Sequence, residues 1–103
     1  MKVKDILRKL GVNSTYAGHE LTITAVELAK EKPGRLTAVT KELYPECAKR
    51  HNVSICSVER NIRTVAGKAW QRNPELLMKI AGYPIDTPPS AREFVEMLSV
   101  ASK

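Results

Sequence analysis

The sequence predicts an all-α fold, a compact bundle of about six helices that contains a helix-turn-helix. Apolar residues recur at helical spacing in several stretches, and there is no convincing run of alternating β-branched residues. Aromatic residues make up only 5% of the chain. A length of 103 residues suits one domain with a single core that needs no disulfide or metal. We therefore expect residues 1–103 to form a single helix-turn-helix domain.

The first third of the chain predicts two amphipathic helices. Residues 2–10 form the first, which Gly11 ends. The second is expected over residues 21–32, where Thr24 and Glu27 suit a capping box. Pro33 and Gly34 then break the chain, and a short helical turn is expected around residues 36–40.

Residues 41–72 predict two further helices joined by a tight turn. The first starts at Leu43 or Tyr44, because Pro45 is tolerated only within the first turn. The second covers residues 55–72, and Ser54 is a suitable N-cap for it. Its apolar residues are spaced as one buried helical face: Val58, Ile62, Val65, Ala66, Ala69 and Trp70.

The joint between these two helices has the features of a helix-turn-helix. Ala48 is small where the helices meet, Asn52 tolerates a left-handed backbone in the turn, and Val58 packs back on the first helix. The motif covers about residues 43–72. Its second helix, about 55–72, is the expected recognition helix, which in this geometry enters the DNA major groove.

The C-terminal third predicts two short helices. Asn73 and Pro74 end the long helix, and a helix follows over residues 75–81. Residues 82–89 form a loop with three prolines. Ser90 and Glu93 then form a capping box for a last helix over residues 91–101.

The positive charge is concentrated on the helix-turn-helix. The chain has a formal net charge of +6, and residues 35–72 alone carry +5, against +2 for residues 1–34 and −1 for residues 73–103. A basic surface beside a recognition helix is typical of nucleic-acid binding. We therefore expect double-stranded DNA as the partner.

Several other classes of protein are not supported by the sequence. It has no apolar stretch of membrane-spanning length and no signal peptide, so a cytoplasmic, nucleoid-associated protein without membrane contact is expected. It has no motif of an enzyme, so no catalytic residue, small-molecule substrate or cofactor is expected. Cys47, His51 and Cys56 lack an evident fourth ligand, so no metal site is expected either.

The residues of the motif resemble a known family. TK-x-LYP-x-x-A-K, then N-x-x-x-x-x-VER-x-IR, then AW-x-R, are similar to the C-terminal DNA-binding effector domain of the master sporulation response regulators of Firmicutes. The similarity extends to Gly11–Val12, Gly82–Tyr83 and Ser90–Phe94, and so covers nearly the whole chain. The resemblance implies a six-helix domain that binds short promoter elements, often as tandem copies, and regulates transcription. It also suggests that the second helix starts earlier than residue 21, near His19. The family's receiver domain is missing from this sequence, so we expect either a fragment of a longer regulator or a free-standing DNA-binding domain.

The resemblance also implies functional residues. Glu59, Arg60 and Arg63 match the family's reading positions, whereas Ser57 and Thr64 stand where the family normally has an arginine and a histidine. The expected base-reading residues are Ser57, Glu59, Arg60, Asn61, Arg63 and Thr64. The expected phosphate contacts are Thr40, Lys41, Lys49, Arg50, Ser54, Lys68 and Arg72.

Two functions are compatible with these residues. The first is sequence-specific binding of double-stranded DNA for transcription regulation, with a possible homodimer on tandem sites. The second is a protein-interaction module that keeps the fold, lacks base specificity of its own, and modulates a full-length regulator. The changes at Ser57 and Thr64 motivate the second reading.

Overall fold

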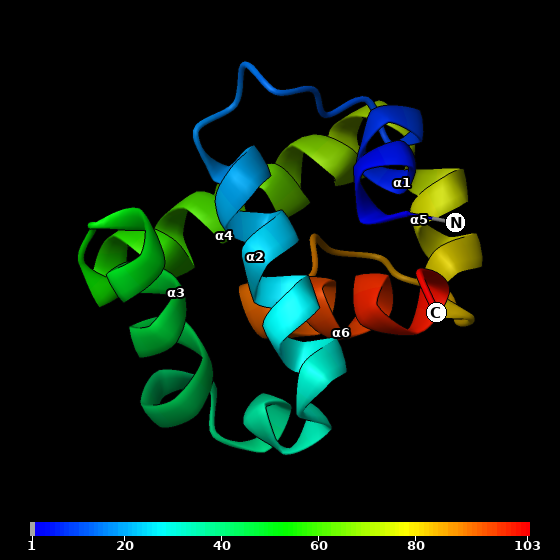
Figure 1. The fold of residues 1–103 in the computed structure, drawn as a ribbon. Coiled ribbons are helices and arrows are strands. Elements are labelled where there is room, and N and C mark those ends of the chain that lie inside the picture. Colours follow the sequence, from blue (N-terminus) through cyan, green and yellow to red (C-terminus); the bar gives the residue numbers. More distant parts are fainter. Residues whose placement is uncertain (1) are drawn as a thin grey trace.

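The fold is described from a computed structural model, which defines residues 2–103 (Figure 1). This part of the chain contains helices and no strand, so the predicted all-α class is confirmed. The helices are α1 (Val3–Lys9), α2 (Gly18–Glu31), α3 (Tyr44–His51), α4 (Ile55–Arg72), α5 (Pro74–Ala81) and α6 (Ala91–Ala101). Two single helical turns, Pro33–Thr37 and Val39–Leu43, connect α2 to α3.

Helix α2 is the centre of the bundle and packs against α1, α3, α4 and α6. It begins at Gly18, next to the start near His19 that the resemblance suggests and three residues before residue 21, so the predicted capping box of Thr24 and Glu27 is wrong. The Thr24 hydroxyl is instead hydrogen-bonded to His51 Nε2 at 2.7 Å, which joins the middle of α2 to the end of α3. The local sequence pattern assigns the Thr24 hydroxyl to a helix cap, whereas in the structure it bonds to a residue 27 positions away.

The connection between α2 and α3 is more regular than the sequence predicts. Pro33–Thr37 is a 3₁₀ turn, and Val39–Leu43 is a π turn whose last bond runs from the Tyr44 N–H to the Val39 carbonyl. The expected turn at 36–40 is thus divided at Ala38, where φ is −146°. Pro45 follows at the start of α3, as expected. Because Pro45 has no N–H, it leaves a carbonyl of the preceding turn without its usual helical partner.

The core lies between α2, α4 and α6. Leu7, Leu28, Ile62, Leu77 and Phe94 are among its fully buried side chains. The last helix has the predicted capping box: Ser90 Oγ accepts from the Glu93 N–H, and Glu93 Oε1 accepts from the Ser90 N–H.

The C-terminal end of α4 is fastened to α1. Asn73 caps α5 by accepting a bond from the Leu76 N–H, and its amide also donates to the Lys9 carbonyl at 3.2 Å. Gly11, with a φ of +87°, follows α1, and a Cβ there would lie 2.8 Å from Arg72 Cδ. The C-terminal end of α4 is therefore fixed by the bond from Asn73 to Lys9 and by the close packing of Arg72 on Gly11.

Candidate nucleic-acid interface

The joint between α3 and α4 has a defined backbone geometry. Asn52 is left-handed, with φ and ψ of 55° and 47°, and it is the only non-glycine residue with a positive φ in residues 2–103. The Val53 N–H donates to the Ala48 carbonyl, and the Asn52 N–H donates to the Lys49 carbonyl. These two bonds form a Schellman motif, in which asparagine is the usual substitute for glycine. The predicted role of Asn52 in the backbone is confirmed.

Helix α4 starts at a side-chain cap and has two distinct sides. Ser54 Oγ accepts a bond from the Ser57 N–H at 3.0 Å, as predicted. The buried side is the predicted apolar face, with Val58, Ile62, Val65, Ala66 and Ala69 buried and Trp70 partly buried. Packing on α2 and α6 thus fixes which side of α4 faces outward.

The six predicted base-reading residues differ in how available their polar groups are. Arg60, Arg63 and Thr64 are exposed, and Ser57, Glu59 and Asn61 are half-buried. Some polar groups are engaged within α4: the Asn61 amide donates to the Ser57 carbonyl at 2.8 Å, and the Thr64 hydroxyl donates to the Arg60 carbonyl at 3.0 Å.

The charged residues of this group behave differently from one another. Arg63 donates to Glu59 Oε1 at 3.0 Å, an i,i+4 ion pair on the exposed side of the helix. Within residues 2–103 the Arg60 guanidinium forms neither a hydrogen bond nor an ion pair with another side chain. Arg60 therefore has all of its donors available to an external partner.

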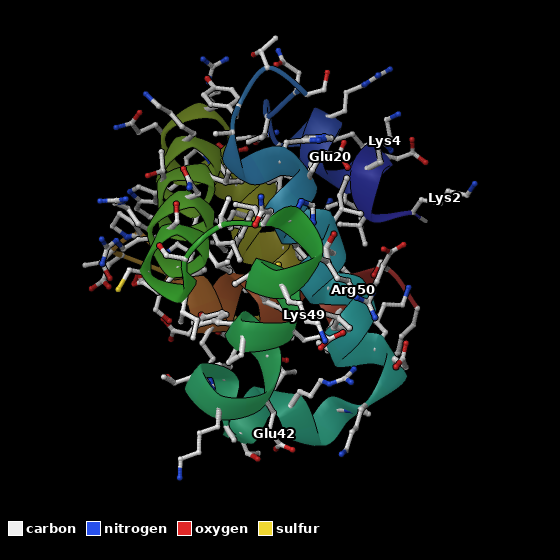
Figure 2. The ribbon with its side chains drawn as sticks, turned by 60° about the vertical axis from the view of Figure 1, so that its left-hand side comes forward. Lys2, Lys4, Glu20, Glu42, Lys49 and Arg50 are labelled. Carbon is white, nitrogen blue, oxygen red and sulfur yellow. The ribbon has the colours of Figure 1, made fainter. Side chains whose placement is uncertain are left out.

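The predicted phosphate-contact residues form two groups. Thr40 and Lys41 on the π turn and Lys49 and Arg50 on α3 are exposed, and Figure 2 shows Lys49 and Arg50 on the outside of α3. Arg50 is paired with Glu46 at 3.3 Å. In the other group, Ser54 is used as the cap, and Lys68 and Arg72 lie further along α4.

Arg72 has contacts of a structural kind. Its guanidinium donates to the Tyr16 hydroxyl at 2.7 Å, and its Cζ lies 5.7 Å from the centre of the Tyr16 ring. The loop before α2 and the end of α4 are thereby joined, which the sequence did not indicate.

A shallow groove of about 430 Å³ lies beside the first two turns of α4. Its lining brings the π turn, α3 and α4 together: Thr40, Tyr44, Ile55, Cys56, Glu59, Arg60 and Arg63. Ile55 was missed as a candidate site residue, and Cys56 was considered only as a metal ligand or a redox-sensitive thiol. The sequence did contain a signal for Ile55, because it is an apolar residue on the outward side of the first turn of α4. In the structure its side chain is 40% exposed.

Tyr44 is the buried wall of this groove. Burial and, secondarily, the nearby Glu59 carboxylate raise the pKa of the Tyr44 hydroxyl to about 12. The hydroxyl is therefore neutral at physiological pH and retains its proton as a hydrogen-bond donor.

Cys47, His51 and Cys56 do not come together. Cys47 is fully buried, its thiol donates to the Leu21 carbonyl at 3.5 Å, and burial raises its pKa to about 11. His51 is bonded to Thr24, and Cys56 is exposed. Across residues 2–103 no three histidine, cysteine or acidic side chains are grouped as a metal would require.

The comparison with known families agrees with this architecture. The family described as "Sporulation initiation factor Spo0A C terminal" matches residues 3–101. The chain belongs to this family. The Spo0A C-terminal family consists of DNA-binding effector domains, so this protein is a DNA-binding domain of the sporulation-regulator type. None of the helices in residues 2–103 combines the length and the apolar character needed to cross a membrane.

Proposed function

We propose that the protein binds specific sequences of double-stranded DNA by placing the first turns of α4 in the major groove. The observation that carries this proposal is Arg60. It is exposed on the second turn of a helix whose start is fixed by Asn52 and Ser54, and its guanidinium has no hydrogen-bond or ion-pair partner within residues 2–103. An arginine in this position can donate two bonds to guanine O6 and N7.

The neighbours of Arg60 have complementary roles in this proposal. Glu59 accepts a bond from a cytosine amino group, and Arg63 exchanges its bond to Glu59 for a base or a phosphate. Ile55 packs on the methyl group of a thymine, because an apolar side chain at the groove edge is a suitable contact for that group. Ser57, Asn61 and Thr64 remain candidates for base contacts at the edges of the site.

Phosphate contacts position the helix. Lys49, Arg50, Thr40 and Lys41 lie on the elements that flank the groove, which suits contacts to the DNA backbone. We propose that Arg72 mainly holds Tyr16 and the α1 end of the fold. We further propose that two copies of the domain bind tandem DNA sites and regulate transcription from them.

The test is selection of binding sites from a random duplex library at about 150 mM salt. We expect a defined motif, and Arg60→Ala should lose preference at one guanine position, at a cost of about 1–3 kcal/mol of discrimination. Lys79→Ala, an exposed change on α5, is the control and should leave the motif intact. If neither protein selects a motif, base readout is refuted and the interaction-module function takes its place.

A further inference from the structure

The Tyr44 hydroxyl is a hydrogen-bond donor that the fold leaves unused. Tyr44 is 4% exposed, and its hydroxyl makes no hydrogen bond within residues 2–103. In this part of the chain, the side-chain nitrogen and oxygen atoms that are enclosed without a partner are His19 Nδ1 and Ser102 Oγ. The Tyr44 oxygen is not one of them, so it reaches solvent at the groove that Tyr44 lines. Because buried polar groups normally have a partner, this hydroxyl points to one that is supplied from outside.

The groups around this hydroxyl do not take its proton. Glu59 accepts its bond from Arg63 at 3.0 Å and not from Tyr44. The pKa of about 12 keeps the phenol protonated, so it donates throughout the physiological pH range. The Thr40 hydroxyl lines the same groove and also makes no bond within residues 2–103, and the lining is positive because Arg60 and Arg63 outnumber Glu59. Hydroxyl groups and arginines are the side chains that commonly contact phosphate oxygens.

The place of Tyr44 in the motif agrees with a phosphate contact. Tyr44 is the first residue of α3, which is the first helix of the helix-turn-helix. In complexes of this motif, the first helix crosses the DNA backbone while the second lies in the major groove. The start of α3 and the first turns of α4 border the same groove, so a phosphate can lie there while α4 contacts bases.

We propose that the Tyr44 hydroxyl donates a hydrogen bond to a DNA phosphate lying over this groove, with the Thr40 hydroxyl beside it. This inference rests on the proposed placement of α4 in the major groove, and it assigns a contact that the sequence did not indicate. The contact is uncharged. It therefore positions the helix on the backbone without the release of a counterion that a lysine contact brings.

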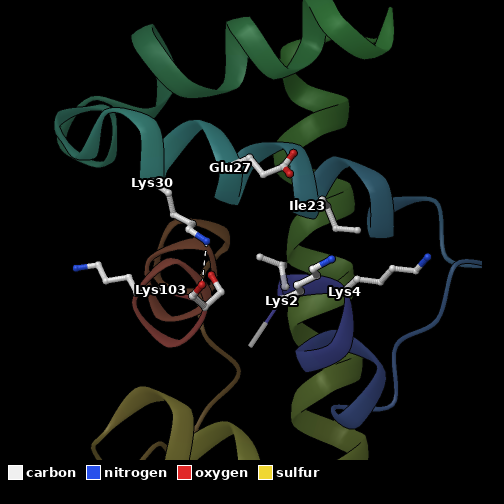
Figure 3. Close-up of a pocket in the computed structure, with 8 residues that line it drawn as sticks. Lys2, Lys4, Ile23, Glu27, Lys30 and Lys103 are labelled. Carbon is white, nitrogen blue, oxygen red and sulfur yellow. Dashed lines mark hydrogen bonds between the residues drawn. The ribbon is translucent and has the colours of Figure 1, made fainter.

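The cavity between the two ends of the chain shows that positive charge alone does not make such a site (Figure 3). This cavity is lined by the start of α1, one side of α2 and the residues after α6. The ammonium groups of Lys4 and Lys103 point away from it on opposite sides, and Lys30 is already bonded to the Ser102 carbonyl at 2.9 Å. Its lysines therefore do not converge on one point.

The test is Tyr44→Phe, which removes the hydroxyl and keeps the ring. Fluorescence anisotropy should show affinity falling about five- to tenfold, equally for a duplex of random sequence and for the selected duplex, because a phosphate contact carries no sequence information. The slope of log Kobs against log salt should stay the same, since a neutral hydroxyl releases no counterion. Urea unfolding should give the wild-type free energy, because the hydroxyl has no partner in the fold. Tyr83→Phe, on the exposed loop after α5, is the matched control and should change none of these.

Methylphosphonate substitution then locates the phosphate. When single phosphates of the selected duplex are replaced in turn, we expect one position at which the wild type loses affinity and Tyr44→Phe does not. Equal responses of the two proteins at every position would overturn the proposal. So would an unchanged affinity for both duplexes, a loss confined to one base pair, or a loss that accompanies a fall in the free energy of unfolding. The random duplex needs no motif, so failure of this contact is distinguishable from failure of base readout.

Discussion

Gly18 on α2 lies directly against the backbone of Asn61 on α4. A Cβ atom at residue 18 would be 2.3 Å from the Asn61 carbonyl oxygen and 2.7 Å from Cγ2 of Val65. The two helices therefore touch through main-chain atoms, and no side chain separates them. This contact sets the distance between the central helix and the proposed recognition helix.

We expect Gly18→Ala to destabilise the fold by about 1–3 kcal/mol, because the nearest obstructing atom belongs to the Asn61 backbone and cannot rotate away. Gly67 is the matched control: it also lies in a helix, and a Cβ there would meet nothing within 4 Å. Gly67→Ala should stabilise the protein by about 0.5–1 kcal/mol. Urea unfolding followed by circular dichroism measures both. Equal effects of the two changes would contradict the close contact.

The proposed contact of Ile55 with thymine can be tested through the DNA. Replacing each thymine of the selected site by deoxyuridine removes one methyl group, and at one position we expect affinity to fall about fourfold, the effect of burying one methyl group at about 0.8 kcal/mol. Ile55→Ala should abolish this sensitivity. Fluorescence anisotropy with the two DNA versions gives the comparison. If the variant keeps the sensitivity, another residue makes the contact.

The salt dependence of DNA affinity distinguishes basic residues that contact phosphate from basic residues that stabilise the fold. Lys49→Ala should reduce the slope of log Kobs against log salt by about 0.9, the value for one phosphate contact. Arg72→Ala should leave the slope unchanged and lower the free energy of unfolding instead, because its guanidinium is bound to Tyr16. Titrations at several salt concentrations decide between these outcomes. A reduced slope for Arg72→Ala would restore it as a phosphate contact.

The capping box of α6 predicts a pH dependence of stability. Hydrogen bonds from the Ser90 N–H and side chain lower the pKa of Glu93 below its ordinary value of 4.5. The ionised carboxylate thus stabilises the fold fully above that value, and this contribution is lost as the pH falls through the lowered pKa. Ser90→Ala should cost about 1 kcal/mol at neutral pH, since it removes the cap.

Thermal unfolding of the wild type and Ser90→Ala from neutral to acidic pH measures this effect. The difference between the two proteins should shrink toward low pH, because acid weakens the box in the wild type as well. A difference that stays constant would show that Glu93 is not coupled to the cap.

Local patterns in the sequence predicted most of the helices. Asn52, Ser54 and the Ser90–Glu93 box act within a few residues of themselves, so their roles are readable from spacing alone. The same reasoning failed for Thr24, whose hydroxyl bonds to His51 on another helix. Gly18 was missed for a related reason: its importance depends on a backbone 43 positions further along.

The candidate DNA surface was predicted in outline, and the structural contact of Arg72 was not predicted at all. Arg60 and Arg63 stand in one helix, where a period of 3.6 residues places them together. Arg72 and Tyr16 are 56 positions apart, and only the packing of the loop before α2 on the end of α4 brings them together. Charge summed by segment therefore located the basic region, and it did not distinguish Arg72, whose guanidinium is bound within the fold.

The bond between Glu59 and Arg63 means that a carboxylate of the protein competes with DNA for Arg63 in the proposed complex. While the domain is free, the carboxylate occupies the guanidinium and holds it in a defined position. In the proposed complex, a base or phosphate that takes the donor now held by Glu59 must replace that carboxylate, so a duplex that also satisfies Glu59 would gain more than one that does not. Removing the Glu59 carboxylate would then raise the affinity for non-specific DNA and reduce the preference for the selected sequence. If the domain binds specific sequences as proposed, this ion pair would set part of its selectivity before any DNA is bound.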